Sequence, residues 1–248
     1  MAINDIMTIL TVSLLIYVAT KVAFWVKPAH ALIAFAVVML LSTPIWMIYA
    51  ETNIFNWLKI YTIGITACLI FMASIVSDYW KKKIFLVLYL VVAANIAELV
   101  AVEFINTGDM INPIAGLLLI ISLPLTSAFH LDDRSSYLLY DIDWLYILAY
   151  SIWNLIGIYN LTSGSTTVYS LIHLGIPILM MAGRTGLYLQ YRVVVLFLFM
   201  IYWMYAHIFP LKIEAPYIYN AGVSNWTPRK TSPFGEEFDS VGALICGE

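Results

Sequence analysis

The sequence predicts an all-α membrane protein built as a bundle of about eight transmembrane helices. Of its 248 residues, 62% are hydrophobic and 11% are charged, and the mean hydropathy is +0.90. A soluble domain of this length carries about 25% charged residues. The apolar runs are continuous, unlike the alternating segments of about 10 residues in transmembrane β-barrels. We therefore expect a membrane domain over residues 1–211 and a polar tail over residues 212–248.

Eight apolar runs reach or approach the length that crosses a bilayer. About 20 helical residues span a hydrocarbon core of about 30 Å, and backbone groups in lipid must be satisfied within the segment. Proline predicts a kink or interruption in three runs, at Pro44, Pro124 and Pro177. The first run should stay in the bilayer, because no basic residue precedes it as in a cleavable signal peptide. The runs cover residues 7–25, 29–50, 58–77, 84–105, 111–129, 142–162, 167–183 and 186–210.

The distribution of basic residues predicts that both termini lie on the outer side. With eight spans, the connections after spans 1, 3, 5 and 7 share one side, and Lys and Arg concentrate on the cytoplasmic side. We therefore expect a multi-pass protein of the plasma (inner) membrane. The inner side holds eight of the twelve basic residues, which are Lys21, Lys27, Lys81, Lys82, Lys83, Arg134, Arg184 and Arg192.

Polar side chains from four of the predicted helices lie at a similar depth in the outer half of the membrane. Their depth follows from position within each span, at about 1.5 Å per residue. The layer contains Asn95, Glu98, Asn154, His173 and Tyr202. Asn95 and Glu98 are three residues apart, so they share one helix face. We predict these five residues as a substrate-binding site, with Glu98 as its central charge and His173 as a titratable neighbour.

Polar residues within a membrane have two explanations. Asn, His and Tyr side chains hydrogen-bond across helices and contribute about 0.6–2 kcal/mol each, which is the simpler explanation for Asn154 or Tyr202 alone. An intramembrane carboxylate costs about 3 kcal/mol at mid-helix and usually has a function. This cost favours a functional Glu98. Arg192, in contrast, lies close enough to the inner face to snorkel as an interfacial anchor.

Other candidate residues have simpler explanations. The inner loop 130–143 holds His130 and four aspartates, but their spacing matches no metal motif, and Asp141 is placed to cap the sixth helix. Glu103 and His207 lie near the outer ends of their spans, and a mouth to the cavity and a solvated surface position explain them equally well. There is no zinc pair, nucleophile elbow or Walker loop, and no basic segment typical of nucleic-acid binding. We expect no metal, cofactor or nucleic acid.

Four stretches stand out as motifs: Asn95-Ile-Ala-Glu98 with Val102-Glu103, Asn112-Pro-Ile-Ala-Gly116, Trp144 to Ala149 followed by Ser151-Ile-Trp-Asn154, and His207-Ile-Phe-Pro-Leu211. Through them the chain resembles, over about residues 57–211, an uncharacterised family of bacterial multi-pass membrane proteins, a domain of unknown function. The resemblance implies no activity, substrate or cofactor. It implies that Glu98, Asn112 and Asn154 belong to one recurring arrangement.

The leading functional hypothesis is a channel or transporter for a small solute or ion, in which Glu98 binds a cation or proton. A second hypothesis is an integral-membrane enzyme acting on a lipid or quinone, with Glu98 and His173 as acid and base. A third is a structural subunit of a larger membrane complex, in which internal pairing or a partner helix neutralises Glu98. The expected partners are membrane lipids and the solute, and a homo-oligomer or a membrane complex stays open.

Overall fold

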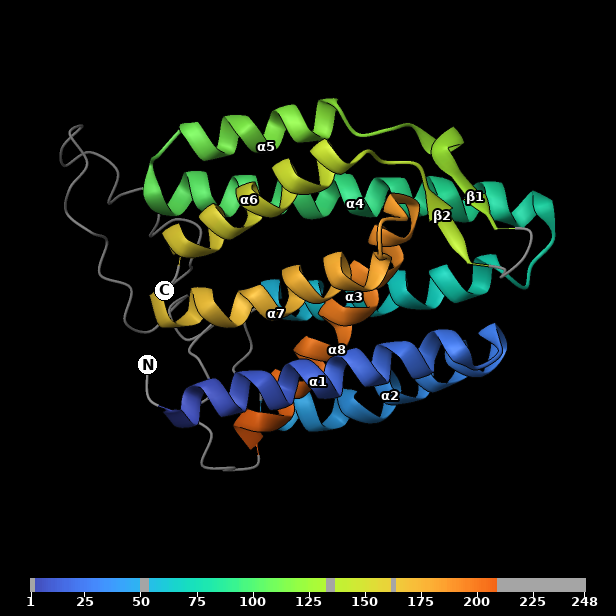
Figure 1. Cartoon of the computed structure of the whole chain (residues 1–248), viewed down its shortest axis with the longest axis horizontal. Helices are drawn as coiled ribbons and strands as arrows, with labels where there is room; N and C mark the ends of the chain where they lie inside the picture. The colour runs from blue at the N-terminus through green and yellow to red at the C-terminus, as the bar shows by residue number, and fades with distance from the viewer. Residues whose placement is uncertain (1–2, 50–53, 133–136, 162–163, 209–248) are drawn as a thin grey trace.

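The protein is a bundle of antiparallel helices in the computed structural model, which describes residues 3–49, 54–132, 137–161 and 164–208 (Figure 1). Successive helices alternate in direction, so α1 begins at the end of the bundle where α8 ends. These residues contain eight α-helices: α1 (Ile3–Trp25), α2 (Pro28–Tyr49), α3 (Ile54–Ala73), α4 (Asp78–Thr107), α5 (Ile111–Ile121), α6 (Trp144–Leu161), α7 (Gly164–Met181) and α8 (Tyr188–Ile208).

Helix α8 is the central element of the bundle. It packs against α1, α3 and α7, and it crosses them obliquely in Figure 1. Two hydrophobic clusters meet on it: Val195 and Phe199 belong to the larger cluster, and Val194 and Phe197 belong to the second. Val194 and Val195 are adjacent and both 0% exposed. Apolar burial on opposite sides is the pattern of a helix surrounded by protein, so any polar residue on α8 needs a partner within the bundle.

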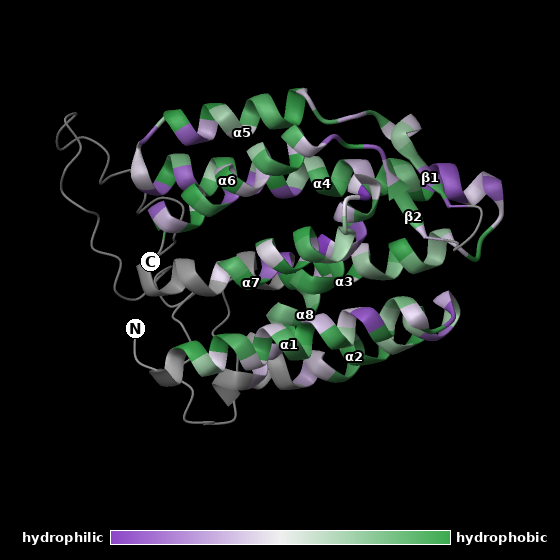
Figure 2. Ribbon diagram, viewed as in Figure 1, coloured by the Kyte–Doolittle hydropathy of each residue, from purple (hydrophilic) through white to green (hydrophobic). Residues whose placement is uncertain are grey.

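Three helices are long and apolar enough to cross a membrane: Ile6–Trp25, Asp78–Thr107 and Thr185–Tyr202. Many large hydrophobic side chains are also exposed; Leu40, for example, is 69% exposed. Figure 2 shows that hydrophobic residues occur along most of the helices. Exposed apolar area on this scale is unfavourable in water but matches a lipid environment. The predicted all-α class is confirmed, and its apolar helices agree with the prediction of a membrane protein.

The predicted span 111–129 is corrected by the structure. Helix α5 ends at Ile121, and the chain then passes through a 3-10 turn, η1 (Thr126–Ala128). Pro124 explains this end, because proline has no N–H to donate and disfavours helical backbone in the residue before it.

A short β-hairpin follows, made of β1 (Phe129–Leu131) and β2 (Leu138–Tyr140), which pair in antiparallel register. The rings of Phe129 and Tyr140 stack with their centroids 4.0 Å apart. The Tyr140 hydroxyl donates a hydrogen bond to the Pro124 carbonyl, and burial raises the pKa of this phenol above its ordinary value. The hairpin therefore closes one end of the bundle as a packed element.

The capping residue of α6 also differs from the prediction. The Asp143 Oδ1 atom accepts a hydrogen bond of 2.7 Å from the Tyr146 N–H, because Asp143 directly precedes the first residue of the helix and occupies the N-cap position. Asp141 instead lies with Oδ2 3.5 Å from His130 Nδ1. The predicted tail 212–248, Arg134 and the side chain of His207 lie outside the described residues.

Candidate functional site

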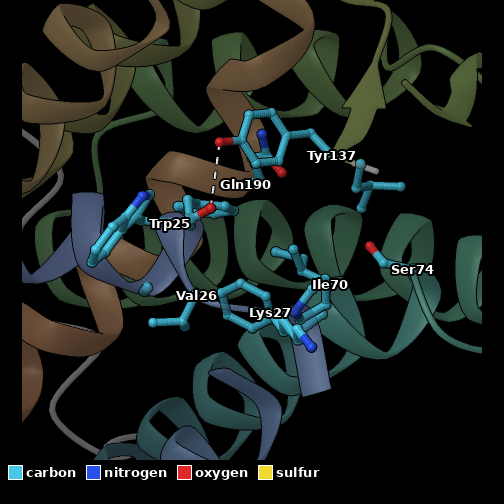
Figure 3. Close-up of a pocket in the computed structure, with 12 residues that line it drawn as sticks. Trp25, Val26, Lys27, Ile70, Ser74, Tyr137 and Gln190 are labelled. Carbon is cyan, nitrogen blue, oxygen red and sulfur yellow. Dashed lines mark hydrogen bonds between the residues drawn. The ribbon is translucent and has the colours of Figure 1, made fainter. Parts of the chain in front are cut away.

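A pocket of about 250 Å³ opens where α1 turns into α2, bounded also by α3, α8 and the start of β2 (Figure 3). Most of its wall is apolar, and Lys27 lies opposite Tyr137 and Gln190. Gln190 is 1% exposed, and neither Nε2 nor Oε1 has a hydrogen-bond partner among the described residues. None of the five predicted binding residues lines this pocket, so it is separate from the predicted site.

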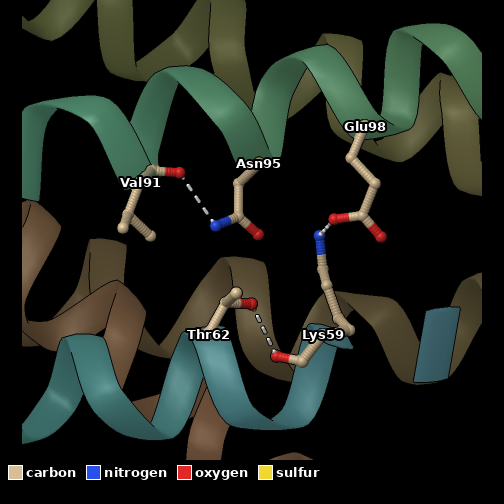
Figure 4. A network of polar contacts seen from close by, with 5 residues as sticks. All are labelled: Lys59, Thr62, Val91, Asn95 and Glu98. Carbon is tan, nitrogen blue, oxygen red and sulfur yellow. Dashed lines mark hydrogen bonds and ion pairs between the residues drawn. The ribbon is translucent and has the colours of Figure 1, made fainter. Parts of the chain in front are cut away.

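Glu98 forms an ion pair with Lys59 between α4 and α3 (Figure 4). The Lys59 Nζ atom lies 2.9 Å from Glu98 Oε2, and the two side chains are 20% and 26% exposed. Because α3 and α4 are antiparallel, Lys59 near the start of α3 lies beside Glu98 in the second half of α4. Sequence reasoning missed this partner, because Lys59 lies at the start of the predicted span 58–77 and was not counted among the polar residues of the layer.

Asn95 lies one turn before Glu98, and Figure 4 shows both side chains directed toward α3. This agrees with the shared face that their spacing predicts. Asn95 Nδ2 donates to the Val91 carbonyl at 3.0 Å. On the facing helix, the Thr62 hydroxyl donates to the Lys59 carbonyl at 3.0 Å. The ion pair therefore lies in a polar seam between α3 and α4, with an amide one turn away.

A second polar group lies where α7 packs on α8. His173 is 6% exposed and Arg192 is 5% exposed. The His173 ring contacts Phe199 with centroids 5.3 Å apart, and Arg192 and Lys59 are both within electrostatic range of it. His173 Nδ1 and Arg192 Nε and Nη1 have no hydrogen-bond partner within the described part of the chain. The expected snorkelling of Arg192 is therefore wrong, since protein surrounds its side chain.

Asn154 lies on α6, which contacts α8 close to Arg192. The hydroxyls of Ser151 and Tyr188 lie 3.2 Å apart and join α6 to α8. Asn154 follows Ser151 by three residues and Arg192 follows Tyr188 by four, which is about one helical turn along each helix. Asn154 Oδ1 is buried without a partner among the described residues. We call Asn154, His173 and Arg192 the Arg192 group.

The five predicted binding residues thus separate into neighbouring sets. Asn95 and Glu98 face α3, whereas His173 and Asn154 belong to the Arg192 group. Tyr202 is partly buried on α8 and packs against the larger hydrophobic cluster. Lys59 connects the two sets, because it pairs with Glu98 and acts electrostatically on His173.

Glu103 occupies a sealed site that the sequence prediction placed in water. It is 0% exposed. Its Oε2 accepts a hydrogen bond of 2.6 Å from Asn112 Nδ2, and its Oε1 accepts one of 2.6 Å from Asn160 Nδ2. The position of Asn112 is fixed in turn, because Trp153 Nε1 donates a hydrogen bond of 2.9 Å to the Asn112 backbone carbonyl. No ion pair between described residues includes Glu103. We call Glu103, Asn112 and Asn160 the amide cage.

The short motifs of the sequence were the available signal for the amide cage. The stretches that contain Glu103, Asn112 and Trp153 come together here, although they lie on three different helices. Gly116 belongs to the same packing, since a Cβ atom at this position would lie 2.7 Å from the Trp153 ring. Close approach of helices at small residues is typical of membrane bundles.

Comparisons with known proteins do not assign the chain to a family. No family model, curated protein or solved structure matches it. The resemblance to an uncharacterised bacterial family therefore stays a prediction. The polar groups differ in chemistry: the Lys59–Glu98 pair is partly exposed and can exchange partners, the Arg192 group has unused donors and acceptors, and the amide cage is saturated.

Proposed function

We propose that the protein is an integral-membrane channel or transporter for a small solute or ion, with eight spans and both termini outside. The observation that carries this proposal is the Lys59–Glu98 ion pair, which is 20% and 26% exposed and lies between two apolar helices. Beside it, the Arg192 group holds buried polar atoms without partners. Intramembrane ionisable groups that adjoin unsatisfied polar atoms are typical of solute and ion pathways.

The alternation of helix direction supports the eight-span topology. Lys27, Arg184 and the lysines of 81–83 all lie near the end of the bundle with the hairpin, which agrees with a cytoplasmic position for this end. Helix α5 has 11 residues and covers only about 16 Å. In the proposed eight-span topology, the connection after Ile121 completes this crossing.

The ion pair also gives a mechanism for coupling. In a medium of low dielectric constant, separating Lys59 from Glu98 leaves two uncompensated charges, which costs several kcal/mol. Uptake of a proton by Glu98 removes one of the two charges, and an ion bound to one partner compensates that partner, so either event lowers the cost of opening the pair. Opening of the Lys59–Glu98 pair is therefore coupled to the binding of a proton or an ion. Once the pair is open, α3 can move relative to α4.

The test is flux through proteoliposomes that contain the full chain. An entrapped pH dye measures proton flux under a clamped potential, and stopped-flow light scattering measures uncharged solutes. We expect Glu98→Gln to reduce the pH-dependent flux about tenfold, which corresponds to about 1.4 kcal/mol. Asp78→Asn is the matched control, because it removes an exposed ion pair with Lys81 on the same helix. Unchanged flux and unchanged pH dependence in Glu98→Gln reject the proposal.

The same ion pair favours a second candidate function, a structural subunit of a larger membrane complex. Internal neutralisation by Lys59 removes the need for any ligand at Glu98. The exchange Lys59→Glu with Glu98→Lys separates the two functions, because it keeps an ion pair and reverses its direction. A structural role is retained in this double variant. Transport is lost, because the site that takes up the proton has moved to α3.

A further inference from the structure

The buried charges of the bundle do not balance around α8. Glu98 is neutralised by Lys59 at 2.9 Å, and the Glu103 carboxylate is held by two amides. Arg192 is 5% exposed, and none of the ion pairs formed by described residues includes it. A guanidinium stays protonated in proteins. An uncompensated charge of this kind costs several kcal/mol in a protein interior and is costly in a membrane.

The described residues around Arg192 offer no net negative charge to compensate it. Lys59, the other cation that acts on His173, is already paired with Glu98. The neighbouring Tyr188 side chain is a hydroxyl with no formal charge, and it is hydrogen-bonded with Ser151. Charge complementarity therefore favours an anion at this point.

The unused hydrogen-bonding atoms indicate how an anion would be held. Arg192 Nε and Nη1 are N–H donors without partners among the residues described. His173 offers a ring nitrogen, and Asn154 offers a side-chain amide that can rotate to present either its donor or its acceptor. We propose that the solute recognised in the interior is a small monovalent anion, bound by Arg192 with His173 and Asn154 beside it. The passage of this anion across the membrane rests on the transport function proposed above, whereas its binding to Arg192 does not.

Binding can be measured without transport, on the full chain purified in detergent. Sodium acetate and sodium nitrate are titrated while sodium gluconate, a bulkier anion, holds the ionic strength constant. The readout is the midpoint of thermal unfolding, because a ligand that binds only the folded state raises this midpoint with concentration. We expect a saturable increase for the native chain with at least one of the two probe anions. No increase with either anion overturns the proposal.

Variants of Arg192 identify the site. Arg192→Gln should remove the anion dependence, and Arg192→Lys should weaken it about tenfold, because lysine keeps the charge but loses the planar array of donors. Arg184→Gln is the control, since this arginine is exposed and pairs with Asp132. Anion dependence that is unchanged in Arg192→Gln overturns the proposal. If Arg192→Gln does not fold, the anion concentration that half-saturates Arg192→Lys is compared with that of the native chain. An unchanged concentration overturns the proposal.

The two proposals can fail separately. Anion binding that depends on Arg192, together with no flux in proteoliposomes, contradicts the transport function and keeps the anion site. Flux that depends on Glu98, together with no anion binding, keeps the transport function and overturns the anion site.

Discussion

Two carboxylates on α4, Glu98 and Glu103, have opposite surroundings although they are only five residues apart. Five residues correspond to a rotation of about 140° around the helix, so the two side chains face different neighbours. Glu98 faces α3, is 26% exposed and meets the cation of Lys59. Glu103 faces α5 and α6, is 0% exposed and meets amides only. The first carboxylate can exchange its partner for an ion, whereas the second has both oxygens occupied.

The comparison shows that a buried acid is not by itself evidence for a functional site. In the amide cage every carboxylate oxygen has a donor, and hydrogen bonds to a charged group are worth about 1.5–3 kcal/mol each. Such a site stabilises helix packing and gives a ligand no free atom to bind. At Glu98 the stabilisation comes from one lysine, and partial exposure lets other species reach the pair. We therefore expect Glu103 to stabilise helix packing and keep the functional role as a proposal for Glu98.

The largest expected effect is that of Glu103→Ala. This substitution removes both hydrogen bonds to the Glu103 carboxylate, including that of the buried Asn112 amide, and it opens a cavity, so we expect a loss of about 3–5 kcal/mol in stability. Thermal unfolding and monodisperse yield in detergent measure it. Glu98→Ala is the comparison and should lose less, because part of its surroundings is accessible. An equal or larger loss for Glu98→Ala contradicts the distinction between the two sites.

A smaller loss is expected for Gly157→Val, which tests how tightly the amide cage is packed. A Cβ atom at Gly157 would lie 3.2 Å from Glu103 Oε2 and 3.3 Å from Asn112 Nδ2. Overpacking of this kind costs about 1–3 kcal/mol. Gly175→Val is the matched control, since a Cβ atom there meets no atom within 4 Å. Equal unfolding temperatures for the two variants would show that the cage can expand.

The Lys59–Glu98 pair should show coupling of intermediate size in a double-mutant cycle. Lys59→Met and Glu98→Gln, alone and combined, should give a coupling energy of about 1–2 kcal/mol, in the range found for residues in direct contact. Thermal unfolding in detergent gives the three values that the cycle needs. The same cycle on Lys81 and Asp78, an exposed pair at 2.8 Å, should give a smaller value. Coupling that is no larger at Lys59 and Glu98 would mean that water screens this pair fully.

The smallest effect is expected for the exposed pair of Arg184 and Asp132, whose atoms lie 3.2 Å apart. Arg184→Gln should change stability by less than about 0.5 kcal/mol, because surface ion pairs are solvated and screened. A larger change would show that the hairpin depends on this pair, and it would disqualify Arg184→Gln as the control for anion binding.

Helix positions follow from the sequence because continuous apolar runs leave the backbone in lipid few alternatives. Runs such as 7–25 and 84–105 lie within helices α1 and α4. The second half of the run 111–129 could not be predicted from its hydropathy. The hairpin there depends on the stacking of Phe129 on Tyr140, a contact between residues that are distant in the sequence.

The sequence singled out Glu98 as an acid within an apolar run, but it did not give the direction of its side chain. The shared depth of the five residues, which comes from counting residues along each span, stays a prediction. The face of a helix that meets a given neighbour depends on packing, which no residue count provides. For this reason Lys59 was not identified as the partner of Glu98, and Glu103 was expected in water although α5 and α6 cover it. For the same reason Arg192 was expected at the membrane interface, although its side chain is buried where α7 packs on α8.

The continuous course of α4 has a consequence for how this chain can vary. Its three consecutive lysines, residues 81–83, favour the polar edge of the bilayer and fix where the apolar part of the helix begins. One residue inserted between Lys83 and Asn95 would turn Glu98 by about 100° and move it about 1.5 Å, away from Lys59. Most substitutions along this stretch leave that geometry intact, whereas a single insertion or deletion abolishes it. Conservation of length there matters more than conservation of residue type.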